Sequence, residues 1–548
     1  MQSTATWRNG KHESYTDGSK TYAVICNEMP RRAIRSNAPQ TSSIRTCSAE
    51  PAVISPGFRQ RLRRLRCLRT TGINMAFKEY GSYDGLGLAG LVRKKQVSPR
   101  ELLDEAIART AKVDPQINAV VVKHYDYAQA QIDKGLPDGP FTGVPFLLKD
   151  LDILEGTRTT SGASVYKDNV ADHTGTLAQR FLDTGVTIFG KSSSPEFGLM
   201  PTTESRLFGP TRNPWNLAHS SGGSSGGAGA AVAARILPVA HASDGGGSIR
   251  IPASASGVFG LKPTRARNPL GPDRGEGWAG FSCGHVLSIS VRDSAAMLDA
   301  IHGPEPSSLY VAPPPERPFA QEVGRDPGRM RIAFTDKSPY GDTIDPEIAA
   351  AVREVASLLA GLGHHVEERA PVLAADPAVV MSTIVSANTA LNVRVAEQRF
   401  GRTMTDSDFE ILTLASAHNA QKATATDYVE AQLSAFQISR GLATFFQTCD
   451  VFLCPTLCSP PLRIGELNTM SEDLSHIAPI LRRYMPATAM YNMSGQPAMS
   501  MPLAWNAAGL PLGMMFAARF GDEATLFRLA AQLEQERPWK DRLPPICA

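Results

Sequence analysis

The chain is organised around the stretch from His219 to Thr264, which reads HSSGGSSGGAGAAVAARILPVAHASDGGGSIRIPASASGVFGLKPT. Two glycine-serine clusters lie inside it, at Gly222–Gly227 and at Gly245–Ser248. Glycine has no Cβ, so such clusters permit positive φ and the close approach of a ligand. A flexible linker would have a similar composition. Here an alanine-rich helical run, Ala228–Ala234, and an apolar strand-like run, Ile236–Ala240, separate the clusters, so each is predicted to lie at the end of a packed element.

Two serines on rigid turns require a base if one of them is to act as a nucleophile. The residues around Ser248 do not form a G-x-S-x-G elbow, and no histidine motif lies nearby. Lys149, in contrast, follows the apolar run Val144–Leu148. Burial disfavours the ammonium form and lowers the pKa of a lysine. A neutral lysine can act as a base, and serine–lysine pairs are a variant of the hydrolase triad.

With these motifs the chain resembles the amidase signature family. GGSSGG, then D-x-G-G-S-I-R-x-P, then GLKPT occur in the order and spacing typical of that family, downstream of a lysine in a V-P-x-x-x-K-D context. The resemblance covers the chain from about Tyr80 to Pro538. It implies that Ser248 is the nucleophile, that Ser224 is a bridging serine on a cis peptide bond, and that Lys149 is the terminal base.

The resemblance also implies roles for the residues around the nucleophile. Backbone N–H groups of the glycine turn would hold the oxyanion of the tetrahedral intermediate, because glycines leave the approach free of side chains. The expected donors are Gly245, Gly246, Gly247 and Ser248. We interpret Asp244 and Arg250 as supports that fix the turn, and Ser225 as a candidate hydrogen-bond partner of the lysine–serine chain.

The fold implied by the resemblance is α/β, with a central mixed β-sheet flanked by helices on both faces. The implied reaction is hydrolysis of a carboxamide C–N bond through an acyl-enzyme. Within the family the chain looks most like the 6-aminohexanoate-cyclic-dimer hydrolases, with near counterparts of GVPFLLKDL, TRNPWNL, PVAHASD and NMSGQPAMSMPL. That group tends to carry alanines where this chain has three glycines before Ser248, so simple amides, aryl-acylamides, esters and urethanes all stay open as substrates.

Two other functions stay open at this point. One is the A subunit of a glutamyl-tRNA amidotransferase, which would share the triad, work with partner subunits and show glutaminase activity. The other is a catalytically inactive binding protein, against which the presence of Lys149, Ser224 and Ser248 argues.

The composition, 42% hydrophobic and 20% charged, is typical of a globular enzyme. The net charge of +3 is distributed unevenly: residues 1–74 contain 13 Lys/Arg and 4 Asp/Glu, which leaves the rest of the chain at −6. A mildly acidic body argues against nucleic acid as a partner. The sequence contains no run of 18 apolar residues, so no membrane span is predicted. The expected partner is therefore a small-molecule amide, and a homodimer stays open.

Residues 1–74 are predicted to form a disordered basic extension, and residues 75–548 a single amidase signature domain. The extension is rich in Arg and Ser and poor in acids, which is typical of an organellar transit peptide. Translated upstream sequence, with Met75 as the natural start, is the simpler interpretation.

No metal or organic cofactor is expected. The eight cysteines include no CxxC pair, and Cys454 and Cys458 are interpreted as core or loop thiols. Reduced thiols are typical of the cytoplasm, which is the predicted location. Gly185–Ser192 matches the Walker A pattern, but the four residues between its glycines are β-branched or aromatic, which indicates a buried strand instead of a phosphate loop.

Further elements follow from local patterns. Arg331–Phe334 and Cys449–Pro455 are predicted strands, and residues 376–446 are predicted to be largely helical. Asn492–Pro502 is interpreted as the C-terminal strand motif of the family.

Overall fold

The computed structural model describes residues 15–17, 20–22, 77, 79–340, 342 and 344–548. The chain divides into two units, Met1–Asn74 and Met75–Ala548. Within the first unit only β1 (Tyr15–Asp17) and β2 (Lys20–Tyr22) are described, and they pair antiparallel. The predicted disordered extension therefore lies largely outside the described residues.

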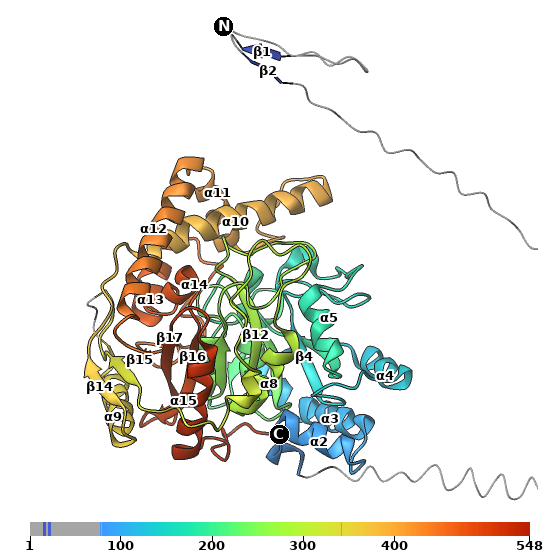
Figure 1. Ribbon diagram of the computed structural model, residues 1–548. Coiled ribbons are helices and arrows are strands. Elements are labelled where there is room, and N and C mark those ends of the chain that lie inside the picture. The colour runs from blue at the N-terminus through green and yellow to red at the C-terminus, as the bar shows by residue number, and fades with distance from the viewer. Residues whose placement is uncertain (1–14, 18–19, 23–76, 78, 341, 343) are drawn as a thin grey trace, which may run out of the picture. The chain divides into compact units, whose positions relative to one another are not determined.

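A mixed sheet of eight strands forms the centre of the second unit (Figure 1). In sheet order its strands are β10 (Val239–Asp244), β12 (Cys283–Ser288), β11 (Phe259–Lys262), β16 (Ala498–Trp505), β17 (Pro511–Ala518), β15 (Val451–Pro455), β13 (Arg331–Phe334) and β14 (His365–Glu368). β13 pairs parallel with both β14 and β15, and the other neighbours pair antiparallel.

The described part of the second unit also contains α-helices. They are α2 (Gly85–Arg93), α3 (Pro99–Ile117), α4 (Tyr125–Lys134), α5 (Thr176–Asp183), α6 (Gly226–Ala233), α7 (Arg250–Ser256), α8 (Val291–Ile301), α9 (Pro346–Gly361), α10 (Pro377–Phe400), α11 (Ile411–Ala420), α12 (Ala425–Phe445), α13 (Ile477–Tyr484), α14 (Met490–Ser494) and α15 (Glu523–Glu536).

Helices cover both faces of the eight-stranded sheet. Side chains alternate between the two faces along each strand, so the apolar residues of one strand pack with helices on both sides. On β17, Met514 and Phe516 pack with α8, α9 and α15. The intervening Met515 and Ala517 pack with α10, α12 and α14 on the other face. The predicted α/β fold with a central mixed sheet and helices on both sides is confirmed.

A second sheet carries the lysine proposed as base. Its strands, in order, are β3 (Val120–Lys123), β5 (Thr187–Ser192) and β4 (Pro145–Lys149), and β4 packs beside β10 of the large sheet. Every residue of β4 and β5 is buried. The Walker-like string therefore ends in a buried strand, as its β-branched and aromatic residues predict.

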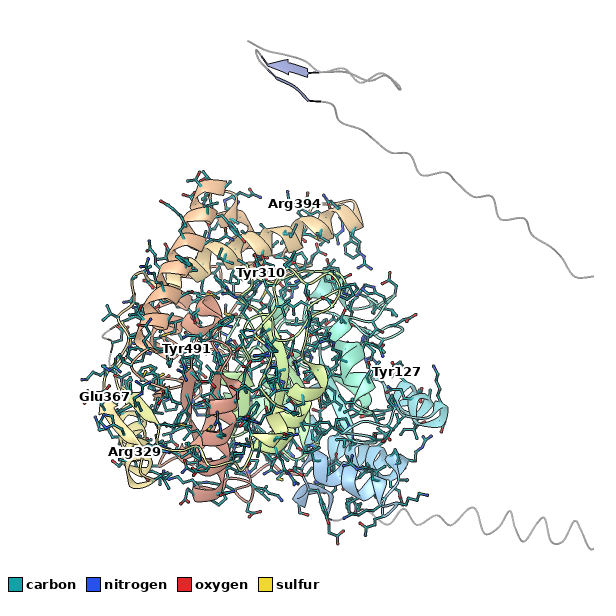
Figure 2. The ribbon with its side chains drawn as sticks, viewed as in Figure 1. Tyr127, Tyr310, Arg329, Glu367, Arg394 and Tyr491 are labelled. Carbon is teal, nitrogen blue, oxygen red and sulfur yellow. The ribbon has the colours of Figure 1, made fainter. Side chains whose placement is uncertain are left out.

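The helices α10, α11 and α12 lie together at one end of the unit, drawn in gold and orange in Figure 1. The helical prediction for residues 376–446 is confirmed. Figure 2 shows the contrast within this part of the fold: Arg394 of α10 points outward, whereas Tyr491 of α14 is enclosed. By length and composition alone α10 could cross a membrane, a property it shares with apolar helices of globular proteins.

Three local predictions need correction. The strand expected at Ile236–Ala240 begins at Val239 and continues to Asp244, because Arg235 and Ile236 still belong to the turn that ends α6. The strand predicted from Cys449 begins at Val451. The motif from Asn492 begins in the short helix α14, and strand β16 starts only at Ala498.

Candidate active site

Lys149 is the last residue of β4, and its side chain is fully buried. Its Nζ lies within hydrogen-bond distance of three serine hydroxyls, Ser224 Oγ at 2.8 Å, Ser225 Oγ at 2.9 Å and Ser243 Oγ at 3.0 Å, and the ammonium form can donate to all three. Burial lowers the pKa of Lys149 to about 7, although the nearby carboxylate of Asp152 favours the charged form. A lysine in this state can hold or release a proton near neutral pH.

Ser224 and Ser225 immediately precede α6, and both are buried. The Gly223–Ser224 peptide bond is cis. The backbone of Gly222 packs against Pro252 in the first turns of α7, so the first glycine-serine cluster lies against the helix that follows Ser248. The two clusters of the sequence thus meet in the fold.

The second cluster follows β10 as a tight turn around the carboxylate of Asp244. Its Oδ1 accepts the N–H of Gly247 at 2.7 Å, and its Oδ2 accepts the N–H of Ile249 at 3.1 Å. Gly247 has a φ of +133°, which an L side chain rarely adopts. Ser248 lies between these two bonds, half-buried at the start of α7.

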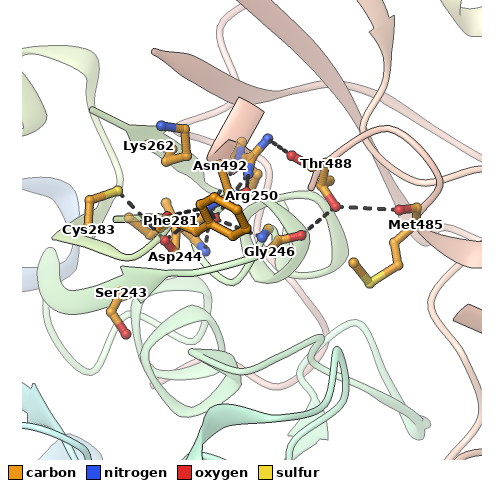
Figure 3. A network of polar contacts seen from close by, with 12 residues as sticks. Ser243, Asp244, Gly246, Arg250, Lys262, Phe281, Cys283, Met485, Thr488 and Asn492 are labelled. Atoms are coloured by element: carbon orange, nitrogen blue, oxygen red, sulfur yellow. Dashed lines mark hydrogen bonds and ion pairs between the residues drawn. The ribbon is translucent and has the colours of Figure 1, made fainter. Parts of the chain in front are cut away.

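Arg250 holds Asp244 from the other side (Figure 3). Its Nε and one terminal nitrogen donate to the two carboxylate oxygens, each at 3.0 Å, and both side chains are fully buried. Burial alone would raise the pKa of Asp244, but the guanidinium beside it lowers that pKa to about 2. The pair therefore stays ionised and fixes the turn that carries Ser248.

Asn492 and Thr488 complete this support; the sequence analysis assigned Asn492 to a strand motif and gave Thr488 no role. Asn492 Nδ2 donates to the backbone and side-chain oxygens of Asp244, at 3.0 and 2.8 Å, and its Oδ1 accepts from Arg250 at 2.7 Å. Thr488 Oγ1 donates to the carbonyl of Gly246 at 2.7 Å. Because Asn492 belongs to the helix α14 and not to a strand, its side chain can reach back into the turn.

The backbone donors around Ser248 differ from the predicted set in one residue. The N–H of Gly247 already donates to Asp244, so Gly247 is not free to hold an oxyanion. Among the described residues no acceptor is found for the N–H groups of Gly245, Gly246 and Ser248. Gly245, Gly246 and Ser248 therefore remain the predicted donors to an oxyanion.

Two apolar side chains cover the glycines of the turn. A Cβ on Gly245 would lie 2.7 Å from Trp278 Cε3, and a Cβ on Gly246 would lie 3.1 Å from Met381 Cε of α10. Trp278 and Ala279 both have left-handed backbone conformations, with φ of +52° and +54°. The indole therefore contacts the turn at the place where the absent methyl group would be.

His241 on β10 is another basic side chain near Lys149, and its contacts give it a different role. Its Nδ1 accepts the backbone N–H of Lys149 at 3.3 Å and lies 3.6 Å from Asp152 Oδ2. Full burial lowers the pKa of His241 to about 4, so the ring is neutral. It supports the end of β4, and within residues 79–340 its side chain forms no hydrogen bond with Ser224, Ser225, Ser243 or Ser248.

In the described part of the chain no group of three His, Cys, Asp or Glu side chains could hold a metal ion. Cys454 and Cys458 are both buried, and burial raises the pKa of each thiol. They lie in the core and its adjoining loop, where thiols behave as small apolar side chains.

Comparison with known proteins places this geometry in a family. The family described as Amidase matches residues 101–527. The 6-aminohexanoate-cyclic-dimer hydrolase of Pseudomonas sp. (strain NK87) is 38% identical over 480 residues, covering 84% of this chain and 96% of the relative. A solved structure of 6-aminohexanoate cyclic dimer hydrolase is similar with a TM-score of 0.81 at 36% identity, covering 85% of this chain and 99% of that one.

A bacterial aryl acylamidase of the amidase signature family also has a similar structure, with a TM-score of 0.76 at 26% identity over 84% of this chain and 98% of that one. The family match spans most of the chain, and the hydrolase of Pseudomonas sp. (strain NK87) is similar to it over 84% of its length. This chain belongs to the amidase signature family and hydrolyses carboxamide C–N bonds.

Proposed function

We propose that Ser248 is the nucleophile, that Ser224 relays its proton, and that Lys149 is the base that receives it. The observation that carries this proposal is the 2.8 Å contact between Lys149 Nζ and Ser224 Oγ in a fully buried setting. A hydroxyl has both a donor and lone pairs, so Ser224 can give one proton to the lysine while taking another from Ser248.

The reaction proceeds in two halves that balance in protons and bonds. Ser248 Oγ forms a bond to the amide carbonyl carbon as its proton moves through Ser224 to neutral Lys149. The tetrahedral intermediate collapses, the C–N bond breaks, and the amine leaves with the proton held by Lys149. Water then forms a bond to the carbonyl carbon of the acyl-enzyme as its proton moves through Ser224 to Lys149. The bond to Ser248 Oγ breaks as the relay returns this proton to Ser248, and the carboxylic acid is released. The N–H groups of Gly245, Gly246 and Ser248 would stabilise the oxyanion in both halves.

The proposed substrates are small apolar carboxamides, both linear and cyclic. Trp278 and Met381 border the turn that carries Ser248, and apolar walls favour an apolar acyl group. The cyclic dimer of 6-aminohexanoate is the first substrate to test, because a relative at 38% identity is named for it. We further propose a cytoplasmic enzyme without nucleic acid or membrane partners, functional as a monomer or homodimer.

Single substitutions and acyl trapping test the triad. Ser248→Ala and Lys149→Arg should each lose about 10³-fold or more in kcat, because arginine keeps the charge but does not release its proton. Ser382→Ala, an exposed serine on α10, is the matched control and should keep full activity. Hydroxylamine should divert the acyl group of a cyclic amide, alkyl amide or anilide into a hydroxamate. Retention of most kcat by Lys149→Arg would exclude the lysine as base.

Residues 75–548 are proposed to form the complete amidase domain. A chain that starts at Met75 should keep the kcat and melting temperature of the full chain, because the proposed site residues begin at Lys149. Loss of folding in the shortened chain would contradict this division.

A further inference from the structure

Three serine hydroxyls surround the amino group of Lys149. Ser224 belongs to the proposed relay and Ser225 was predicted as a hydrogen-bond partner, but Ser243 has no role so far. Ser224, Ser225 and Ser243 lie 2.8, 2.9 and 3.0 Å from Nζ. A neutral lysine has two N–H donors and one lone pair. The relay requires that the lone pair point at Ser224, so both N–H groups need other acceptors.

Ser225 is an acceptor for one of these N–H groups, because its own hydrogen is already used. Its hydroxyl donates to the carbonyl of Ser243 at 3.2 Å and accepts the N–H of Ser243 at 3.3 Å. A serine hydroxyl has one donor and two acceptor sites. The remaining acceptor site of Ser225 therefore faces Lys149, and the lone pair of the lysine cannot be directed there.

The remaining N–H and the lone pair of neutral Lys149 are then directed at Ser224 and Ser243, one at each. Ser224 is 2% exposed, and its only side-chain partner among the described residues is Lys149. Ser243 is half-buried at the end of β10, and its side chain points away from the Asp244 network in Figure 3. The hydroxyl of Ser243 can donate its hydrogen to water, so its oxygen can accept an N–H of Lys149. The hydroxyl of Ser224 is shielded from water, so its hydrogen is best donated to the lone pair of the lysine nitrogen.

We propose that Ser243 is a positioning residue that accepts the second N–H of neutral Lys149 and thereby leaves the lysine lone pair for Ser224. This inference rests on the proposed relay and adds to it the reason for its direction. Ser225 and Ser243 together hold the amino group in one rotational state. The order of bonds is then Ser248 to Ser224 to Lys149, with both lysine hydrogens directed away from the reacting atoms.

Charged groups close to Lys149 would influence a pH profile and have to stay unchanged in the test. Asp152 and Asp244 favour the ammonium form. His241 accepts the backbone N–H of Lys149, and the buried amino group of Lys191 donates to the carbonyl of Asp152. Ser243 carries no charge, so its replacement removes a hydrogen-bond acceptor and leaves this set of charges intact.

The test compares Ser243→Val with Ser243→Thr, which have the same shape and differ in one hydroxyl. Ser243→Ala, which adds no atoms, replaces Ser243→Val if the larger side chain prevents folding. The kcat and KM for an accepted amide are measured from pH 5 to pH 10, together with the melting temperature. Ser248→Ala and Lys149→Arg are measured alongside, because their inactivity tests the relay itself.

The variants without the hydroxyl should lose about 3- to 10-fold in kcat at high pH, the effect of one hydrogen bond that selects a rotational state. KM should stay unchanged, since Ser243 acts through Lys149. The midpoint of the pH profile should fall by about 0.5–1 pH unit, because the ammonium form loses a stronger bond than the neutral form. Ser243→Thr should restore both values.

Two results would overturn the positioning role. One is a kcat and midpoint of Ser243→Val or Ser243→Ala equal to those of the native chain. The other is a Ser243→Thr variant as slow as Ser243→Val, since the hydroxyl would then not be the cause. If either occurred while Ser248→Ala and Lys149→Arg remained inactive, the proposed relay would stand and only the role of Ser243 would fail.

Discussion

The stretch from His219 to Thr264 and the helices α10 to α12 place their polar and apolar groups in opposite ways. The first buries charged and polar groups, among them the ion pair of Asp244 and Arg250, and pairs them. The second exposes large apolar side chains, which are Val379, Leu391, Val395 and Phe400 on α10 and Val429, Leu433 and Phe436 on α12.

The difference indicates which part of the molecule is constrained by chemistry. A buried network tolerates little change, because each unpaired group loses its solvation without compensation. Exposed positions on α10 to α12 have no such partners, while a few residues of this part, such as Met381, reach the site. We therefore expect the turn around Ser248 to tolerate fewer substitutions than the exposed positions of α10 to α12.

The largest effect on stability is expected from breaking the buried ion pair. Arg250→Ala leaves the carboxylate of Asp244 buried and without its counter-ion, which should lower the free energy of unfolding by about 3–5 kcal/mol. Arg331→Ala is the matched surface control, because Arg331 and Asp450 pair at 2.8 Å while 47% and 23% exposed. That change should be within about 1 kcal/mol. Urea denaturation measures both, and equal losses would contradict the distinction.

Replacement of the buried lysine should change the free energy of unfolding in the opposite direction. Lys149→Met abolishes the proposed base but should raise the free energy of unfolding by about 1–3 kcal/mol, since burial of the amino group is unfavourable. The pKa of Lys149 is 10.5 when unfolded and about 7 when folded. The unfolded chain therefore binds the extra proton between these values, and native stability rises with pH there. The gain of Lys149→Met should accordingly be largest at or below pH 7 and shrink towards pH 10.5, and a gain that grows with pH would refute this assignment.

Substitution of Gly245 by alanine should show how tightly the turn before Ser248 is packed. Its Cβ would lie 2.7 Å from the Trp278 ring, so Gly245→Ala should lower stability by about 1–3 kcal/mol and reduce kcat. Gly246→Ala meets only the flexible end of Met381, at 3.1 Å, and should have a smaller effect. Thermal unfolding and kcat are measured for both and for Gly245→Ala combined with Trp278→Leu. No recovery in the double variant would show that the indole is not the obstacle.

The smallest effect is expected on the outer side of α12. Leu433 is 57% exposed, so Leu433→Ser should change the free energy of unfolding by no more than about 0.5 kcal/mol and leave kcat unchanged. Leu442→Ser, on the same helix and fully buried, should lose about 2–5 kcal/mol. A large loss of stability in Leu433→Ser would mean that this face packs against another part of the molecule or a second copy.

Local patterns predicted much of the fold. The strand Arg331–Phe334 was predicted with its observed bounds, and the Walker-like string was recognised as a strand because its residues are β-branched and aromatic. The prediction failed where a contact outside the segment decides the structure. Asn492 was placed in a strand motif, yet it lies in a helix and bonds to Asp244, 248 residues earlier.

The sequence by itself determined the family, the α/β class and the candidate triad, because glycines, serines and an apolar run before a lysine are local features. Only the tertiary structure decided how these residues meet. Lys149 reaches Ser224 across 75 residues and Ser243 across 94, because β4 packs beside β10 and α6 begins over the same edge. A hydrogen bond requires its partners within about 3 Å, and that distance depends on strand register and packing, which residue spacing along the chain does not encode.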